Sequence, residues 1–169
     1  MNIFKNKVKT EFANEHKIFN FVVDGIDRLR RKRIDYQEYY NPVSFAVEWS
    51  SVSINLGRQA GHTLACNMLY GYYEKLGYKV FIISHNKTRA MSVRDYSHHT
   101  GNYIPEKRCI SIRSALNPDF WRGITFDKTI FIVDNSMRSF ADTVECLSKM
   151  SINLITAKER PFFIGLGLN

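Results

Sequence analysis

The sequence predicts an α/β protein with a three-layer αβα architecture and a mainly parallel sheet, and two observations support this prediction. The first is a pair of near-continuous apolar runs, residues 80–83 and 130–133, which are typical of parallel strands covered on both faces. The second is the succession of strand, loop, helix and strand between residues 51 and 84, which is the pattern of a βαβ unit. With 169 residues, of which 44% are hydrophobic, the chain can bury one sizeable core.

The net charge and the spacing of the cysteines indicate which partners and which cellular compartment to expect for this protein. A formal net charge of +8 favours polyanionic partners such as nucleic acid. Cys66, Cys109 and Cys146 lack the spacing of a disulfide framework or a metal site, which indicates a reducing compartment. No apolar run is long enough to span a bilayer, and the N-terminus lacks the apolar core of a signal peptide. We therefore expect a soluble cytoplasmic protein with no membrane partner.

Residues 1–40 are predicted to form a helical, basic segment, and residues 41–169 the main α/β domain, within a single compact unit. Apolar residues recur in the first segment at a spacing near 3.6, which predicts one or two helices interrupted at Gly25. Five cations then occur within six residues: Arg28, Arg30, Arg31, Lys32 and Arg33. Such a run is either a solvated helix face or a surface that binds nucleic-acid phosphates, and net charge alone does not decide between them.

The main domain is predicted to begin where Asn41-Pro42 ends the first helical segment. Residues 43–49 are expected to be a short strand or an approach to a bound nucleotide. The remaining elements are expected as strands at 51–54, 79–84, 108–113, 128–135 and 160–169, helices at 63–76, 87–96 and 140–150, and loops at 97–105 and 114–127. His98 and His99 are interpreted as loop residues and not as metal ligands, because no carboxylate or cysteine lies nearby at a ligand spacing.

The loop at residues 55–63 follows a strand and leads directly into a helix. A phosphate-binding loop needs this order, because glycines let backbone N–H groups close around an anion and the helix N-terminus adds its dipole. The usual pattern ends in Gly-Lys-Ser/Thr, whereas His62 stands at the lysine position and Leu56 at the first glycine position. Asp134 follows four apolar residues in a later strand, the arrangement that delivers a carboxylate to Mg²⁺.

Three blocks of sequence resemble the ATPase domain of bacteriophage DNA-packaging motors, the terminase large subunit. Residues 57–63, Gly-Arg-Gln-Ala-Gly-His-Thr, resemble that family's Arg-Gln-x-Gly-Lys-Thr loop. Residues 122–127, followed by 130–135, resemble its Arg-Gly segment leading into the acidic strand, and residues 162–169 resemble the strand of its coupling motif. The resemblance covers residues 45–169 and does not extend to the family's nuclease domain.

The resemblance implies a P-loop NTPase fold, with residues 41–169 as a P-loop ATPase-like domain. It further implies an ATP- and Mg²⁺-binding protein of phage DNA packaging or DNA handling in the infected host cell, with DNA, other motor or phage proteins or copies of itself as partners. It assigns Mg²⁺ to Thr63 and Asp134, the γ-phosphate to Arg58, and the end of the coupling strand to Asn169. The nucleotide-binding residues that it implies are Gly57, Arg58, Gln59, Ala60, Gly61, His62 and Thr63.

Two departures from the family pattern bear on catalysis. His62 replaces the loop lysine, and an imidazole is mostly neutral at pH 7 on a shorter side chain. Asn135 replaces the glutamate that activates the attacking water, and a general base contributes ~10²–10⁴-fold to a rate. We therefore expect weak or no hydrolysis. Two alternatives remain open: a catalytically inactive interaction or regulatory module, and a non-specific nucleic-acid-binding protein that uses residues 28–33.

Overall fold

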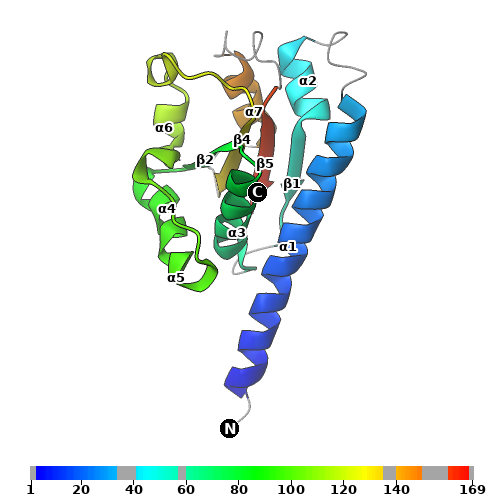
Figure 1. Cartoon of the computed structure of the whole chain (residues 1–169), viewed down its shortest axis with the longest axis vertical. Helices are drawn as coiled ribbons and strands as arrows, with labels where there is room; N and C mark the ends of the chain where they lie inside the picture. Colours follow the sequence, from blue (N-terminus) through cyan, green and yellow to red (C-terminus); the bar gives the residue numbers. More distant parts are fainter. Residues whose placement is uncertain (1–2, 34–40, 57–59, 135–139, 150–159, 168–169) are drawn as a thin grey trace.

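A five-stranded parallel sheet organises the computed structural model, which describes residues 3–33, 41–56, 60–134, 140–149 and 160–167 (Figure 1). The strands are β1 (Ser51–Ile54), β2 (Lys79–Ser84), β3 (Cys109–Ser111), β4 (Thr129–Asp134) and β5 (Phe162–Leu166). Their order is β1-β5-β4-β2-β3, and every neighbouring pair is parallel. The prediction of an α/β fold with a parallel sheet is therefore confirmed.

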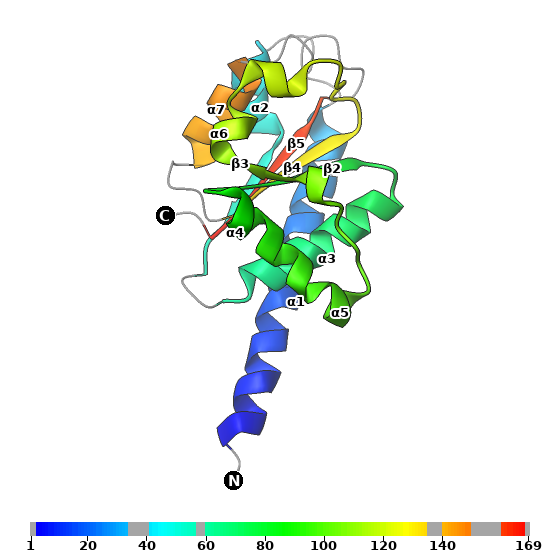
Figure 2. The ribbon, with the colours of Figure 1, turned by 90° about the vertical axis from the view of Figure 1, so that its left-hand side faces the viewer.

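Helices cover both faces of the sheet, as Figure 2 shows. One face packs against α1 (Ile3–Arg33), α3 (His62–Lys75), α4 (Lys87–Ser92) and the 3₁₀ helix η1 (Val93–Tyr96). The other face packs against α2 (Pro42–Trp49), α6 (Ile112–Ala115), the 3₁₀ helix η3 (Pro118–Trp121) and α7 (Phe140–Lys149). Side chains alternate between the two cores along β4, because Ile130 and Ile132 face α3 whereas Phe131 and Val133 face α7.

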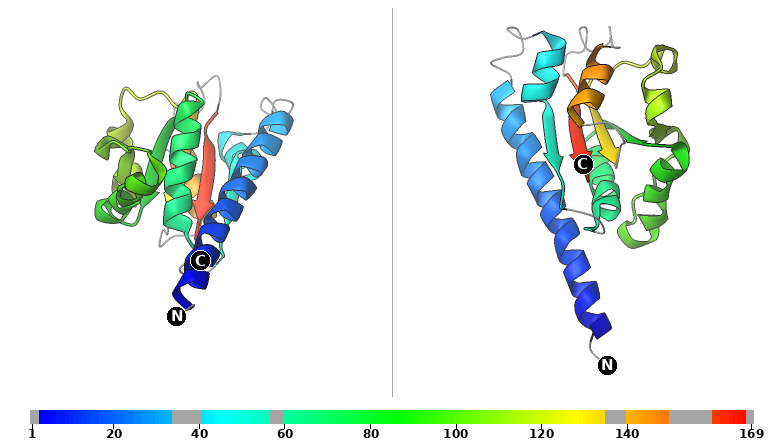
Figure 3. Two further views of the ribbon diagram at one scale, coloured as in Figure 1. Left: turned by 60° about the horizontal axis from the view of Figure 1, so that its bottom comes forward. Right: turned by 180° about the vertical axis from the view of Figure 1, so that it is seen from behind.

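Helix α1 is continuous through Gly25, so the predicted interruption there is wrong. The absent side chain is used for packing, since a Cβ at Gly25 would lie 3.0 Å from Val52 Cγ2 in β1. Ile18, Val22 and Ile26 are buried in the core at helical spacing. The first turns of α1 extend past the rest of the molecule at the edge where the strands end (Figure 3).

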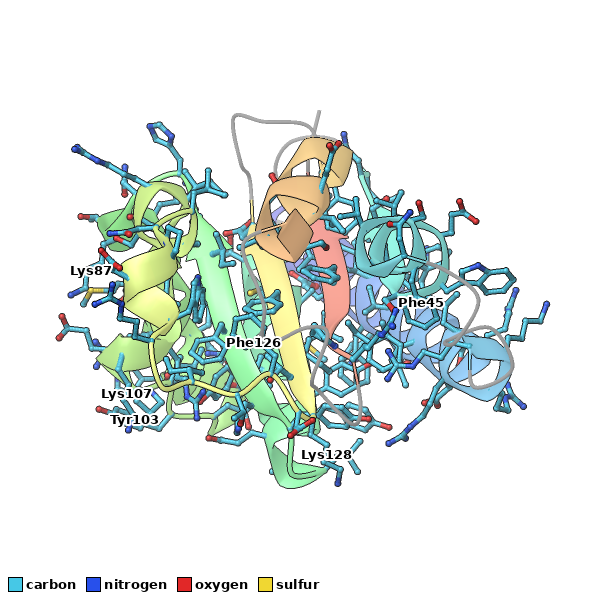
Figure 4. The ribbon with its side chains drawn as sticks, turned by 90° about the horizontal axis from the view of Figure 1, so that it is seen from above. Phe45, Lys87, Tyr103, Lys107, Phe126 and Lys128 are labelled. Atoms are coloured by element: carbon cyan, nitrogen blue, oxygen red, sulfur yellow. The ribbon has the colours of Figure 1, made fainter. Side chains whose placement is uncertain are left out.

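Residues 42–49 form helix α2, so the expectation of a strand there is wrong. Asn41 caps the helix, because its Oδ1 accepts hydrogen bonds from the backbone N–H groups of Val43 (3.1 Å) and Ser44 (2.9 Å). Pro42 then occupies the first turn, where its missing N–H has no consequence. Phe45 is buried beneath the Arg160 guanidinium and lies at the α2 side of the molecule in Figure 4.

Between β2 and β4 the structure is more segmented than predicted. The expected helix at 87–96 is divided into α4 and η1, and the expected loop begins with the short helix α5 (Ser97–Thr100). A further 3₁₀ helix, η2 (Glu106–Arg108), precedes β3. Strand β3 is shorter than predicted because Ser111 caps α6, its Oγ accepting from the N–H of Ser114 at 3.1 Å. Among the described helices, none is long and apolar enough to cross a membrane.

Candidate functional site

The candidate site lies at the edge of the sheet where the parallel strands end. Ile54 and Asp134 both pair in register with Leu166, so β5 separates the end of β1 from the end of β4. Two strand spacings correspond to about 10 Å between the ends of β1 and β4. Parallel α/β sheets bind ligands at this edge. The predicted loop and the predicted acidic strand therefore meet on the same side of the fold.

Gly61 is the N-cap residue of α3 and has a left-handed conformation, with φ +79° and ψ 16°; as a glycine it offers no side chain of its own to cap the helix. A left-handed residue followed by right-handed ones directs successive backbone N–H groups into a concavity that suits an anion, and the helix dipole adds to it. His62 and Thr63 occupy the first turn of this 14-residue helix. The described part of the loop thus has the backbone geometry of an anion site, while Gly57, Arg58 and Gln59 lie outside the described residues.

Glu15 of α1 packs directly against Gly61. A Cβ on Gly61 would lie 2.5 Å from Glu15 Cγ and Oε1, so no larger residue fits without displacing the carboxylate. Glu15 is 5% exposed, which makes it one of the few buried acidic side chains among the described residues. It was not predicted from the sequence, although a signal exists: Glu15 falls at helical spacing with Ile18, Val22 and Ile26 on the apolar face of α1.

His62 joins the start of the loop to the end of β5. Its Nε2 accepts a hydrogen bond of 3.4 Å from the backbone N–H of Leu56, and its ring contacts Gly167, where a Cβ would lie 3.1 Å from Nδ1. Burial lowers the pKa of His62 below its ordinary value, and acceptance at Nε2 requires that nitrogen to be unprotonated. The position of the usual loop lysine therefore contributes no positive charge at pH 7.

Asp134 is a buried carboxylate at the end of β4, with 1% exposure. Its Oδ2 has no hydrogen-bond partner among the described residues. Burial raises the pKa of Asp134 to about 6, against the opposing charge of Arg89 in α4. Removing a buried polar atom's partner typically costs ~1–3 kcal/mol, so an unpartnered carboxylate oxygen in a native fold calls for an explanation.

Asp134 lies close to the start of α3. Burial, and next the negative charge of Asp134, raise the pKa of Cys66, which stands one turn into α3. The structure therefore brings the predicted metal ligand Asp134 near the helix that begins with Gly61, His62 and Thr63. The other predicted residues of the site, Asn135 and Asn169, lie outside the described residues.

Two further residues near Asp134 were not predicted. Ser84, at the end of β2, pairs in register with Asp134, is fully buried, and has an Oγ without a hydrogen-bond partner in the described parts of the chain. Arg89 is exposed and near enough for its charge to act on Asp134. A polar residue that closes an apolar strand is a signal for Ser84, whereas the proximity of Arg89 depends on the sheet order.

The predicted basic surface must be corrected at Arg33. This side chain is 3% exposed, donates a 2.8 Å hydrogen bond to the carbonyl of Arg160, and stacks 3.7 Å from the ring centroid of Phe162. Its role is in the packing of α1 on β5, so it is not available to a nucleic acid. Arg30 donates to the Tyr78 hydroxyl at 2.6 Å. The cations of this run that remain exposed are Arg28, Arg30, Arg31 and Lys32.

The donors present at the site suit Mg²⁺ better than a soft metal. Among the described residues, no group of three His, Cys, Asp or Glu side chains that could hold a metal ion occurs. Mg²⁺ prefers oxygen ligands and typically uses one or two carboxylates together with waters and substrate phosphates. Asp134 offers a buried carboxylate at the end of β4, and Thr63 offers a hydroxyl oxygen in the first turn of α3.

Comparisons of the chain with protein-family models, with curated proteins and with solved structures found no match. The geometry and chemistry of this edge of the sheet are therefore what bears on the function of the chain.

Proposed function

We propose that the chain is a P-loop-type protein that binds ATP with Mg²⁺ and hydrolyses it slowly or not at all. The supporting observation is the N-terminus of α3, led by left-handed Gly61, close to the buried carboxylate of Asp134, whose Oδ2 has no hydrogen-bond partner among the described residues. An anion site beside an unpaired carboxylate is the combination that a nucleotide–Mg²⁺ complex requires.

Each residue has a definite role in this proposal. The backbone of residues 57–63 binds the phosphates, and Thr63 and Asp134 hold Mg²⁺ directly or through water. The metal supplies neutralisation of phosphate charge. His62 adds no positive charge, and the Asn135 amide cannot accept a proton. The protein is therefore expected to bind the nucleotide and to hydrolyse it slowly or not at all. The resemblance to terminase ATPase domains supports a role for such a protein in phage DNA packaging or DNA handling.

Titration with a fluorescent ATP analogue, with and without Mg²⁺, tests nucleotide binding. We expect saturable binding that Mg²⁺ strengthens, and Asp134→Asn should remove most of the Mg²⁺ effect. Asp95→Asn changes an exposed aspartate outside the sheet and is the matched control. Absence of saturable binding at millimolar nucleotide would contradict the proposal and leave the two alternatives, an interaction or regulatory module and a nucleic-acid-binding protein.

Two substitutions restore the usual residues. His62→Lys should tighten ATP binding by about tenfold or more, because a charge-assisted hydrogen bond to phosphate is worth ~1.5–3 kcal/mol. Asn135→Glu should raise phosphate release, since it supplies a general base. If the double variant binds ATP yet releases no phosphate above the parent, these two positions are not what limits hydrolysis.

A second candidate function, nucleic-acid binding, is favoured by the exposed cations of α1. Arg28, Arg31 and Lys32 are exposed in the last two turns, at the amino edge of the sheet. Clustered cations bind the phosphate backbone without sequence preference. This surface is separate from the candidate nucleotide site, because Arg30 and Arg33 of the same run contact Tyr78 and Arg160, which precede β2 and β5.

Salt-dependent binding to duplex DNA tests that surface. Alanine at Arg28, Arg31 and Lys32 together should reduce the slope of log affinity against log salt by about 0.9 for each phosphate that these side chains neutralise. The control removes the same charge elsewhere, with alanine at the exposed residues Lys75, Lys107 and Arg113. Equal slopes for the two triple variants would reject the α1 surface. Arg33→Ala should lower stability and leave the slope unchanged.

A further inference from the structure

The end of β2 contributes a second polar side chain to the candidate site. We propose that Ser84 Oγ and the Asp134 carboxylate together ligate a divalent cation of the Mg²⁺ type. This inference rests on the proposed function, because the cation is the one that would accompany the nucleotide. It adds Ser84, from β2, to the ligands that the loop at residues 57–63 and strand β4 supply.

Strand register places the two side chains next to each other. β2 and β4 are neighbours in the sheet, and Ser84 and Asp134 are paired positions at the carboxyl end of both strands. Along each strand the preceding residues of the same parity, Ile82 and Ile132, belong to the core against α3. Since side chains alternate along a strand, Ser84 and Asp134 project from the same face, toward α3.

Both groups are buried and both have an oxygen atom without a partner. Ser84 is 0% exposed and Asp134 is 1% exposed. Neither Ser84 Oγ nor Asp134 Oδ2 forms a hydrogen bond within the described ranges. Buried polar atoms in native proteins are nearly always satisfied, so two unsatisfied oxygens at paired positions indicate a group between them that the protein itself does not supply.

A divalent cation fits the chemistry of this pair. A carboxylate and a hydroxyl oxygen both offer lone pairs, and the negative charge of Asp134 disfavours an anion. Neighbouring strands are ~4.8 Å apart, and adjacent ligands of an octahedral Mg²⁺, each ~2.1 Å from the metal, are ~3 Å apart. Side chains from paired positions can therefore reach one ion. A single bridging water is the competing explanation.

Mn²⁺ replaces Mg²⁺ as a spectroscopic probe, and its binding to the full chain is measured by electron paramagnetic resonance, with and without ADP. Ser84→Ala should weaken Mn²⁺ binding by about tenfold or more. Ser97→Ala is the matched control, because Ser97 Oγ also lacks a hydrogen-bond partner in the described structure but stands in α5, outside the sheet. It should leave Mn²⁺ affinity unchanged.

Ser84→Cys tests direct ligation. A thiolate prefers soft metals, so this variant should bind Mn²⁺ more weakly and Cd²⁺ more tightly than the parent. Cys66, Cys109 and Cys146 are present in both proteins and therefore do not account for the difference. If Ser84 had only a structural role, its substitution by cysteine would not shift the preference of the site from Mn²⁺ to Cd²⁺. Circular dichroism of each variant confirms that the fold is retained.

The outcomes separate this inference from the proposed function. If Asp134→Asn abolishes Mn²⁺ binding while Ser84→Ala and Ser84→Cys match the parent, only Asp134 ligates the metal and the inference fails, whereas the proposed function stands. If Mn²⁺ binds and depends on Ser84 while no nucleotide binds, the inference stands and the proposed function fails. Absence of Mn²⁺ binding at millimolar metal, with and without ADP, overturns both.

Discussion

At the scale of single residues, Asp134 is the clearest case of a buried side chain whose charged form destabilises the fold. Burial raises its pKa to about 6, well above the ordinary value of an aspartate, with Arg89 acting in the opposite direction. The native protein therefore binds this proton more tightly than the unfolded chain does. Protonation of Asp134 thus contributes to the free energy of unfolding. This contribution is complete below pH ~4 and is lost as the pH rises through about 6.

Asp134→Asn should therefore stabilise the protein at pH 7.5 by roughly 3 kcal/mol, because the pKa of Asp134 is higher by about two in the folded protein than in the unfolded chain. At pH 4 the parent and the variant should unfold at nearly the same urea concentration. Urea unfolding followed by circular dichroism at the two pH values measures the difference. Asp95→Asn, which changes an exposed aspartate outside the sheet, is the matched control. A destabilised Asp134→Asn at pH 7.5 would mean that the native fold needs the charge.

Single residues also mark the limit of what sequence patterns predict. The predicted neutral state of His62 agrees with its lowered pKa, and the predicted position of Asp134 at a strand end agrees with the structure. The burial of Arg33 was not predicted, because all five cations of residues 28–33 were interpreted as one exposed surface. The helical phase of α1 places residue 33 on the buried side, with Ile26 and Val22. Phase within a helix, and not composition, separates the two kinds of arginine.

At the scale of elements, the contact between α1 and the loop before α3 is the feature that the sequence patterns did not predict. Gly61 meets two requirements at once, a positive φ and space for Glu15. The N-terminal helix is therefore part of the candidate site and not only a basic segment ahead of the domain. Long-range contacts of this kind depend on the angle at which two helices cross, which local sequence patterns do not specify.

Gly61→Ala should destabilise the protein more than Gly101→Ala does. Both glycines have positive φ, +79° and +72°, so both substitutions add backbone strain of ~1–2 kcal/mol. Only Gly61 has a neighbour, Glu15, within 2.6 Å of the added Cβ, whereas Gly101 has nothing within 4 Å. Chemical denaturation of the two single variants measures the difference. The double variant Gly61→Ala with Glu15→Ala should recover part of the extra loss, and equal losses for both glycines would show that Glu15 yields freely.

Predictions of elements succeeded for the continuous apolar strands and the main amphipathic helix and failed for two short segments that follow a capping residue. β2 and β4, each six residues, and α3 were predicted nearly to the residue. Residues 43–49 and 108–115 were wrong or incomplete because capping by Asn41 and Ser111 turned short apolar stretches into helix. A cap residue decides the state of a segment too short for periodicity to be read.

At the scale of the whole molecule, the common direction of the parallel strands separates the two functions proposed for the chain. The candidate site occupies the carboxyl edge, where β4 and β2 end, and the exposed cations of α1 lie toward the amino edge. The order itself, with the last strand β5 second in the sheet, was not predicted. Strand order depends on pairings between residues far apart in the chain, such as Ser51 with Phe163, and local patterns contain no information about these.

Native-state hydrogen exchange tests this order across the whole molecule. β4, β5 and β2 each pair on both sides, so their amides should exchange only through global unfolding, whereas the edge strands β1 and β3 should exchange faster. The informative strand is β5, because a segment so near the end of the described chain would ordinarily exchange quickly. Its amides at Phe163 and Ile164 should be as protected as those of Phe131 and Ile132. If β5 exchanged as fast as β3, the C-terminal strand would not lie between β1 and β4, and Gly167 could not bring the end of that strand against His62 at the candidate site.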